Sequence, residues 1–124
     1  MKEERPLAYV AGKLNDDACG YIQNLNRMIR CAVKIRRLGY DVYVPGIAIL
    51  MGLIAGNYEY EDYFDNSQAF LRRADLVIVV PGRETSKGTK REIELAHKLG
   101  IPVKFYCEVV NATYDYDPYE IREA

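Results

Sequence analysis

Residues 76–80 read Leu-Val-Ile-Val-Val and are followed directly by Pro81-Gly82. A continuous run of aliphatic, mostly β-branched residues is typical of a parallel strand that is covered on both faces. The Pro-Gly pair ends the run because both residues favour turns. This stretch therefore predicts the central strand of a parallel α/β sheet.

Further strands and helices are expected to alternate on both sides of this stretch. The expected strands cover residues 7–11, 41–44 and 103–106. Apolar residues at helical spacing predict helices over about 22–36, 62–73 and 88–99. Such alternation implies right-handed crossovers and three layers. We therefore predict a Rossmann-like or flavodoxin-like sandwich with a four- to five-stranded parallel sheet.

Two segments lie outside this alternation. Residues 47–55 are apolar enough to form either a buried helix or an interface segment. The C-terminal residues 107–124 are acidic and rich in tyrosine towards their end, and we expect them to form a tail that docks on the body or on a partner subunit. The length of 124 residues fits a single domain, residues 1–124.

The charge balance excludes several classes of partner. The chain has 17 Lys and Arg against 18 Asp and Glu, so it lacks the excess of basic residues of a dedicated duplex DNA or RNA binder. The longest apolar stretch is about half of what a membrane-spanning helix needs, and the polar N-terminus does not look like a signal peptide. We expect a cytoplasmic protein that binds neither a nucleic acid polymer nor a membrane.

Cysteine and histidine are scarce. The three cysteines are scattered and form no Cys-x-x-Cys pair, and His97 is the one histidine. This excludes a disulfide framework and a His-rich zinc site. We therefore expect no metal and no cofactor, and carboxylates, tyrosines and serines as the groups that carry any chemistry.

Ligands of open α/β sheets bind beyond the carboxyl ends of the strands. In this chain, that edge is expected to carry the loops over residues 12–17, 45–56 and 81–88. The search for a site is thereby narrowed to three loops and the helices that follow them.

Glu92 stands out on the helix expected over 88–99. At 100° per residue it lies in the same stripe as Leu95, Ala96 and Leu99, so its carboxylate faces the core near the start of the helix. Partial desolvation there is an environment that tunes carboxylates for chemistry. The alternative is that Glu92 only stabilises the helix N-terminus or pairs with a basic residue such as Arg91.

Ser86 and Gly88 open the same helix. Free backbone N–H groups and a hydroxyl at a helix N-terminus can bind an anion, and glycine lets a phosphate approach the backbone. The alternative is an ordinary N-cap by Ser86 or Thr85.

Tyrosines offer two further candidates. Tyr9 lies within the apolar first strand, where its hydroxyl needs a hydrogen-bond partner, either near Glu92 or on the backbone. Residues 57–65 mix aromatic and acidic side chains, which could stack on a nucleobase and protonate it, or simply form an exposed helix entrance.

Three motifs together resemble a known family. They are Tyr9-Val10-Ala11-Gly12, the Leu-Gly-Tyr-x-Val-Tyr-Val-Pro segment over 38–45, and Ala74-Asp75 before the central strand with Ser86-x-Gly88-x-x-x-Glu92-x-x-x-Ala96 after it. Over residues 7–106 the chain resembles the nucleoside 2-deoxyribosyltransferase-like family, which includes 2'-deoxynucleoside 5'-monophosphate N-glycosidases. A more distant resemblance links Gly88-Thr89-x-x-Glu92 to the phosphoribohydrolases that activate cytokinins.

The resemblance implies roles for individual residues. Glu92 corresponds to the family's nucleophile and Tyr9 to the tyrosine that orients it. Ser86 occupies the place of the serine that holds a 5'-phosphate, and Gly12 and Gly88 would line the cradle of the sugar and phosphate. Asp65, with Asp62 as its alternative, is the candidate for protonating the leaving base.

The remaining candidate substrate-binding residues are Pro45 and three residues that differ from the family's usual pattern. Ser67 stands near the position of the family's aspartate. Lys13 and Asn15 stand where the mammalian-type monophosphate hydrolases have serine and arginine.

These observations predict an N-glycosidase that cleaves the base–sugar bond of a (2'-deoxy)nucleoside 5'-monophosphate through a glutamate nucleophile. The small molecule would be a nucleotide or nucleoside, and the resemblance implies a homodimer or a higher homo-oligomer. The alternatives are a nucleoside 2-deoxyribosyltransferase, a phosphoribohydrolase-like enzyme and a non-catalytic nucleotide-binding module.

Overall fold

The structure is a computed structural model of the chain, and it describes residues 4–12, 14, 18–81 and 87–110. The strands and helices alternate as the sequence predicts. In chain order they are β1 (Leu7–Ala11), α1 (Ala18–Arg37), β2 (Asp41–Tyr43), the 3-10 helix η1 (Pro45–Ala48), α2 (Ile49–Ala55), α3 (Tyr60–Leu71), β3 (Leu76–Val79), α4 (Lys87–Lys98), β4 (Val103–Phe105) and α5 (Tyr106–Val110).

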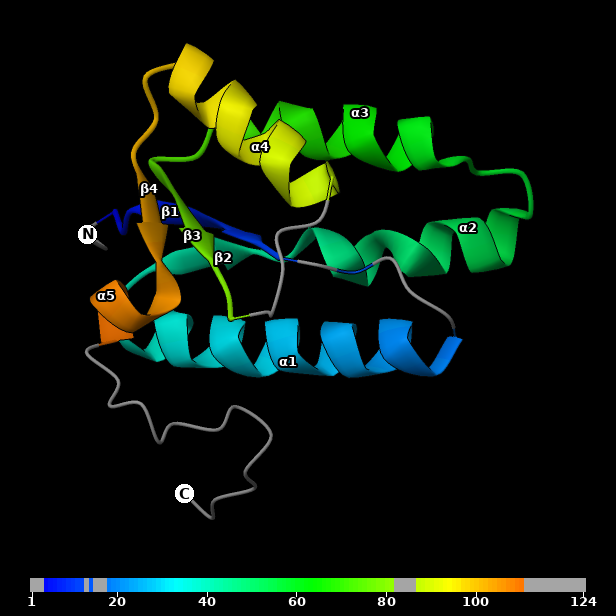
Figure 1. The fold of residues 1–124 in the computed structure, drawn as a ribbon, viewed down its shortest axis with the longest axis horizontal. Helices are drawn as coiled ribbons and strands as arrows, with labels where there is room; N and C mark the ends of the chain where they lie inside the picture. The colour runs from blue at the N-terminus through cyan, green and yellow to red at the C-terminus, as the bar shows by residue number, and fades with distance from the viewer. Residues whose placement is uncertain (1–3, 13, 15–17, 82–86, 111–124) are drawn as a thin grey trace.

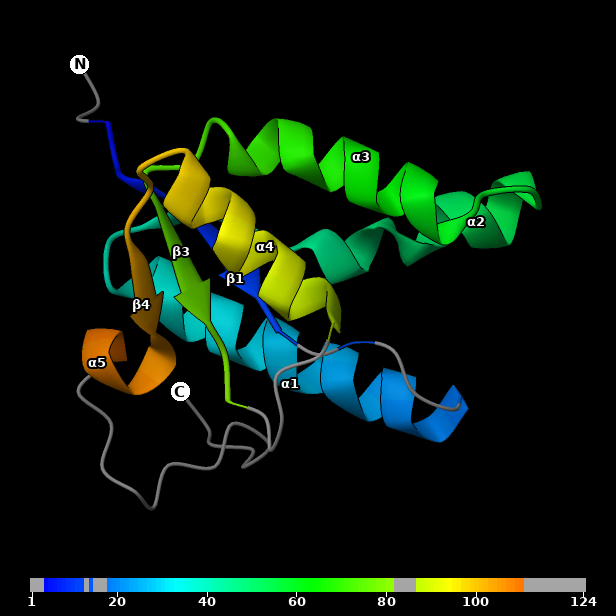
Figure 2. The ribbon, with the colours of Figure 1, turned by 45° about the horizontal axis from the view of Figure 1, so that its top comes forward.

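The described strands form one four-stranded parallel sheet in the order β2-β1-β3-β4. Helices α1 and α5 cover one face, and α3 and α4 cover the other (Figures 1 and 2). The three layers and the parallel sheet confirm the predicted α/β fold.

The side chains of the central strands alternate between two core clusters. Ala8, Val10 and Ile78 pack under α1 with Met28 and Ile35. On the opposite face, a second cluster joins side chains of the same two strands to residues of α3 and α4: Tyr9, Ala11, Leu71, Ala74, Val77, Val79 and Ala96. Because β3 is buried on both faces, its sequence has no polar alternation.

Local signals explain where the helices begin and end. Gly39 and Gly100 follow α1 and α4 with φ angles of 112° and 71°, which glycine adopts without steric cost. Helix α3 begins with a capping box in which Glu59 and Asp62 bond reciprocally to each other's backbone N–H groups.

Two predictions about local structure are corrected. Of the two interpretations of residues 47–55, the buried helix is wrong: α2 contains no buried residue and extends away from the sheet (Figure 1). Residues 106–110 form α5 against α1, so the fourth strand ends at Phe105 and not at residue 106. The rest of the expected tail, residues 111–124, lies outside the described residues. Within the described part of the chain, no helix is both long and apolar enough to cross a membrane.

Candidate active site

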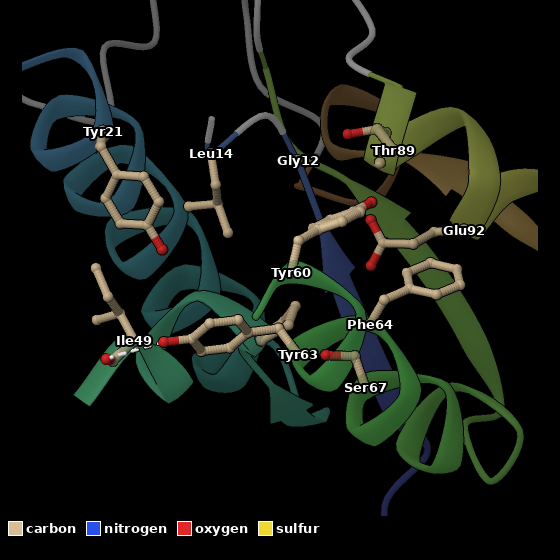
Figure 3. A pocket seen from close by; sticks show the side chains of 12 residues that line it. Gly12, Leu14, Tyr21, Ile49, Tyr60, Tyr63, Phe64, Ser67, Thr89 and Glu92 are labelled. Atoms are coloured by element: carbon tan, nitrogen blue, oxygen red, sulfur yellow. Dashed lines mark hydrogen bonds between the residues drawn. The ribbon is translucent and has the colours of Figure 1, made fainter. Parts of the chain in front are cut away.

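A pocket of about 350 Å³ lies beyond the carboxyl ends of β1 and β2, within the size range of small-molecule sites. Its walls come from both of these strand ends and from the helices α1, α2, α3 and α4 (Figure 3). The lining residues are Gly12, Leu14, Tyr21, Pro45, Ile49, Tyr60, Tyr63, Phe64, Ser67, Gly88, Thr89 and Glu92.

Glu92 and Tyr9 are joined by a hydrogen bond in which the Tyr9 hydroxyl donates to a carboxylate oxygen of Glu92. Tyr9 is 1% exposed and projects from β1, whereas Glu92 is partly buried in the second turn of α4. Of the alternatives for Tyr9, the structure shows the bond to Glu92. The partner of Arg91 is Glu61, at 3.0 Å between Nη1 and Oε1, and not Glu92.

Burial of these two groups shifts their titration. Desolvation raises the pKa of Glu92 from 4.5 to about 7, while the hydrogen bond from Tyr9 acts in the opposite direction. Desolvation and the nearby carboxylate of Glu92 raise the pKa of Tyr9 well above its ordinary value, so the phenol keeps its proton and remains a donor. The pair places a carboxyl that titrates near neutral pH beside a fixed donor.

Ser67 and Tyr43 lie next to this pair. Tyr43 is the register partner of Tyr9 on the neighbouring strand, and the two ring centroids are 5.6 Å apart. Tyr43 also stacks on Phe70 of α3, with centroids 4.2 Å apart and an angle of 6° between the planes. Desolvation raises the pKa of Tyr43 as it does that of Tyr9, and the hydroxyl of Ser67, 7% exposed on the same helix, acts in the opposite direction on both.

An aromatic wall faces Glu92 from α3. Phe64 lines the pocket, and the guanidinium carbon of Arg91 lies 3.6 Å from its ring centroid. The same guanidinium lies 5.7 Å from the centroid of Tyr60 and holds Glu61 in the ion pair described above. Arg91 thereby ties α4 to α3 and holds the Phe64 ring in place.

The opposite wall depends on a close approach between α2 and α3. The Tyr63 hydroxyl donates to the carbonyl oxygen of Ile49 at 3.3 Å, as Figure 3 shows. A Cβ on Gly52 would overlap the same hydroxyl oxygen, so glycine is required at this point for Tyr63 to reach α2. Tyr58 packs edge-on against the Tyr63 ring, with centroids 4.5 Å apart.

The structure brings most of the candidates within the described chain to this pocket. Gly12, Pro45, Ser67, Gly88 and Glu92 line it, and Tyr9 reaches it through Glu92. Lys13, Asn15 and Ser86 lie outside the described residues.

Asp65 is a correction. Its side chain is exposed and does not line the pocket, because it lies about 100° around α3 from Phe64, which faces inward. The alternative acid, Asp62, is also exposed and accepts a hydrogen bond from the Glu59 backbone in the capping box. Neither carboxylate is placed to protonate a ligand in this pocket.

Sequence reasoning missed several lining residues. Thr89 is buried at the first turn of α4, three residues before Glu92, and the helical spacing from Glu92 could have indicated it. Tyr21 and Leu14 could not be found in this way, since the position of Leu14 depends on a hydrogen bond from Asn24 Nδ2 to its carbonyl oxygen, at 3.3 Å. Among the described residues, no cluster of three His, Cys, Asp or Glu could hold a metal ion.

The fold is that of the 2-deoxyribosyltransferases. One such structure, the 2-deoxyribosyltransferase of the psychrotolerant bacterium Bacillus psychrosaccharolyticus, described as a biocatalyst for the synthesis of nucleosides, has a TM-score of 0.66 and 19% identity to this chain. The match covers 87% of this chain and 93% of that one, which confirms the fold that the resemblance implied.

A comparison with protein-family models assigns the chain to a family. Residues 7–105 match the model of a domain of unknown function, DUF4406, and the chain belongs to this family. The matched range runs from the start of β1 to the end of β4 and includes every described residue that lines the pocket. A comparison with curated protein sequences gives no match.

Proposed function

We propose that this protein is an enzyme that cleaves the N-glycosidic bond of a (2'-deoxy)nucleoside 5'-monophosphate, with Glu92 as the nucleophile. The observation that carries the proposal is the hydrogen bond from Tyr9 to Glu92 at the edge of an aromatic pocket. A carboxylate held by a buried donor can attack an anomeric carbon, and aromatic rings such as Phe64 can stack on a base.

The proposed reaction has two steps. The ionised carboxylate of Glu92 forms a bond to C1' of the sugar, and the C1'–N bond breaks with its electron pair leaving on the base, which takes up one proton from solvent. Water then attacks C1', the bond between C1' and Glu92 breaks to return the carboxylate, and the attacking water loses one proton to solvent. The transition states resemble an oxocarbenium ion, so a neighbouring carboxylate lowers their energy.

The monophosphate specificity is supported by the sequence alone. Ser86 stands where the related monophosphate hydrolases hold the 5'-phosphate, and it precedes the N-terminus of α4, where backbone N–H groups favour an anion.

Transfer of deoxyribose to a second base is the other candidate activity. The similarity in fold to a 2-deoxyribosyltransferase favours it, and the first step would be the same.

An activity assay tests these proposals. The protein is incubated with deoxyribonucleosides, ribonucleosides and their 5'-monophosphates, and free base is measured by mass spectrometry. We expect base release from a monophosphate, and a loss on the order of 10³-fold in Glu92→Gln, since removal of a nucleophile leaves only binding and electrostatic effects. The matched control is Glu94→Gln, an exposed carboxylate on the same helix, which should retain full activity.

Several outcomes would contradict the proposal. Unchanged activity in Glu92→Gln would remove Glu92 as the nucleophile, and binding of nucleotides without any base release would favour a non-catalytic binding module. Faster reaction of nucleosides than of their monophosphates would remove the phosphate specificity. A new nucleotide formed when a second base is added would identify transfer.

We also propose that the exposed apolar side chains of η1 and α2 pair with a second copy of this chain. Five large apolar side chains are exposed over η1 and α2, with Ile54 85% exposed; they are Ile47, Leu50, Met51, Leu53 and Ile54. Large apolar side chains that gather on one exposed segment in this way mark an interface more often than apolar side chains scattered singly do. No charged residue occurs between Asp41 and Glu59, so nothing on this segment selects a partner of opposite charge.

This pairing is tested by the mass of the protein in solution. Sedimentation or light scattering should give a dimer or a higher oligomer, and Ile54→Asp should dissociate it because the substitution places a charge in an apolar contact. The control Ile22→Asp, an exposed isoleucine on α1, should leave the mass unchanged. A monomeric wild type, or an oligomer that Ile54→Asp leaves intact, would contradict the proposal.

A further inference from the structure

Tyr60 has the most open ring among the aromatic side chains that line the described pocket. The residue is 43% exposed although it belongs to the pocket wall. Phe64 is only 8% exposed, and the guanidinium of Arg91 lies over one face of its ring. Tyr63 is partly buried, and its hydroxyl is bonded to the carbonyl oxygen of Ile49. An open aromatic face inside a pocket is a surface on which a planar, conjugated group can stack.

The position of Tyr60 is fixed before any ligand binds. It is the first residue of α3, directly after Glu59, and the capping box that joins Glu59 to Asp62 holds this turn of the helix. Its ring centroid lies 6.2 Å from that of Phe64, four residues further along the same helix face, with 32° between the planes. A ring that is already held loses little conformational freedom when a ligand stacks on it, so more of the stacking free energy contributes to affinity.

Arg91 contacts this pair of rings from outside the pocket. Its guanidinium carbon lies 3.6 Å from the ring centroid of Phe64 and 5.7 Å from that of Tyr60, and Arg91 is not one of the residues that line the pocket. Its charge is paired with that of Glu61, with 3.0 Å between Nη1 and Oε1. Arg91 stands directly before Glu92 on α4, so the helix that presents the carboxyl also holds the rings.

The pocket has two chemically different ends. Gly12 and Thr89 lie at the end formed by β1 and the start of α4, where backbone groups and a hydroxyl are available as contacts. Tyr60 and Phe64 form the aromatic end. Figure 3 shows Glu92 between Thr89 and Phe64, with the Tyr60 side chain directed from the start of α3 toward the side of the pocket that carries Glu92. A ligand with a polar group at one end and a planar group at the other would place its middle beside Glu92.

We propose that the base of the substrate stacks on Tyr60, and that Arg91 is a positioning residue for the Tyr60 and Phe64 rings. The base then lies at the aromatic end, the sugar beside Glu92 and the phosphate at the end that carries Gly12. The assignment deepens the proposed function and rests on it, since that function supplies the base and the sugar. Stacking does not read hydrogen-bonding groups, so Tyr60 by itself does not select a purine or a pyrimidine.

A direct attraction between Arg91 and the phosphate is the other way in which this cation could favour a nucleotide. The geometry argues against it, because the guanidinium is stacked at the aromatic end and paired with Glu61. An effect through the rings should be equal for a nucleoside and its monophosphate, and it should largely vanish when the Tyr60 ring is absent. An effect on the phosphate would be confined to phosphorylated ligands.

The experiment measures binding by isothermal titration calorimetry in the Glu92→Gln protein, where turnover does not consume the ligand. The probes are the deoxynucleoside 5'-monophosphates, the corresponding deoxynucleosides and 2-deoxyribose 5-phosphate, which has no base. In Tyr60→Leu we expect the Kd of the base-bearing probes to rise about 10-fold, the order expected when one aromatic ring is removed from a stacked base. The Kd of 2-deoxyribose 5-phosphate should not change. Tyr60→Phe keeps the ring and should retain the affinity, which a role of the phenol hydroxyl would not predict.

The positioning role of Arg91 is tested by Arg91→Met. The Kd of the base-bearing probes should rise about 2- to 5-fold, by the same factor for a nucleoside and its monophosphate. Combined with Tyr60→Leu, Arg91→Met should add little to the loss, because the two residues act as a unit. Arg91→Lys keeps the charge beside Glu61 but lacks the planar guanidinium, so it should recover only part of the affinity; it also carries the test if Arg91→Met does not fold.

Two matched controls lie outside the pocket. Lys90→Met removes a cation from an exposed position one residue before Arg91. Phe105→Leu removes an aromatic ring from β4, where the residue is 52% exposed. Both variants should leave every Kd unchanged.

Unchanged affinity for the base-bearing probes in Tyr60→Leu, or an equal loss for 2-deoxyribose 5-phosphate, would refute stacking on Tyr60. The positioning role of Arg91 would be refuted by wild-type affinity in Arg91→Lys, by a loss in Arg91→Met that is confined to phosphorylated probes, or by a loss that persists in full without the Tyr60 ring.

Binding is measured without turnover, so its result is separate from that of the activity assay. Binding that depends on Tyr60, in a protein whose wild type releases no base, would refute the proposed reaction and leave the stacking standing. Base release together with full affinity in Tyr60→Leu would refute the stacking and leave the reaction standing. Absence of binding by every base-bearing probe would refute both.

Discussion

On the side of the sheet that α1 covers, the buried cluster is mostly aliphatic and contains no carboxyl group, with Cys31 and Tyr106 as its polar members. On the side that α3 and α4 cover, Tyr9 and Ser67 are buried and the carboxyl of Glu92 is partly buried. A single strand supplies both sides, since Val10 points to the first and Tyr9 to the second. The first face therefore stabilises the fold mainly by packing, while the second holds a carboxyl group whose burial costs free energy unless it is paired.

The largest effect on stability is expected on the aliphatic face. Ile35 is fully buried under the sheet, so Ile35→Ala should lower the free energy of unfolding by about 2–5 kcal/mol through lost burial and the cavity left behind. Urea unfolding measures this, and Ile22→Ala, at an exposed position of the same helix, is the control. The pH at which the Glu92 carboxyl is half-titrated should not change in Ile35→Ala. If it did, the two faces of the sheet would not be independent.

A smaller effect of the opposite sign is expected on the polar face. The pKa of Glu92 is about 7 in the folded protein against an ordinary value of 4.5, so the folded state binds more protons between these pH values. Wild-type stability should therefore fall as pH rises from 4.5 through 7. Glu92→Gln lacks this loss and should be more stable than wild type by about 2–3 kcal/mol at pH 8.

Urea unfolding of both proteins at pH 4 and pH 8 checks this difference. At pH 4 the two should unfold at nearly the same urea concentration, since the Glu92 carboxyl is then protonated in both the folded and the unfolded chain. Glu94→Gln, on the exposed side of α4, should show no such dependence on pH. A destabilised Glu92→Gln at pH 8 would mean that the ionised carboxylate stabilises the fold, and the contrast between the two faces would fail.

The fold could be predicted from local patterns, and so could one member of the Tyr9–Glu92 pair, Glu92. The run Leu76–Val80 and the glycines after two helices are signals that act over a few residues, and the phase of Glu92 on α4 follows from helical geometry. The exposed position of Asp65 follows from the same geometry once the phase of α3 is fixed by Phe64, so this error came from assigning a role without the phase.

The rest of the site depends on contacts between distant segments. Tyr43 and Ser67 lie beside Tyr9 because β2 pairs with β1 and because α3 covers the face of the sheet on which Tyr9 projects. Neither arrangement can be predicted from a local sequence pattern. The exposure of α2 has a similar cause. An apolar segment is compatible with burial in the subunit or in an interface, and the packing of the whole chain decides between them.

The register of β1 against β2 places Tyr9 opposite Tyr43. A slip by one residue would turn Val10 towards α3 and α4 and send the Tyr9 phenol towards α1, away from Glu92. The pH titration of the Glu92 carboxyl therefore also reports whether β1 and β2 are correctly aligned. A misfolded population with a shifted register would retain parallel strands and apolar cores, but its Glu92 carboxyl would lose the hydrogen bond from Tyr9. Measured in refolded samples, this titration would give the fraction of molecules in which β1 and β2 have the native register, without the need for any substrate.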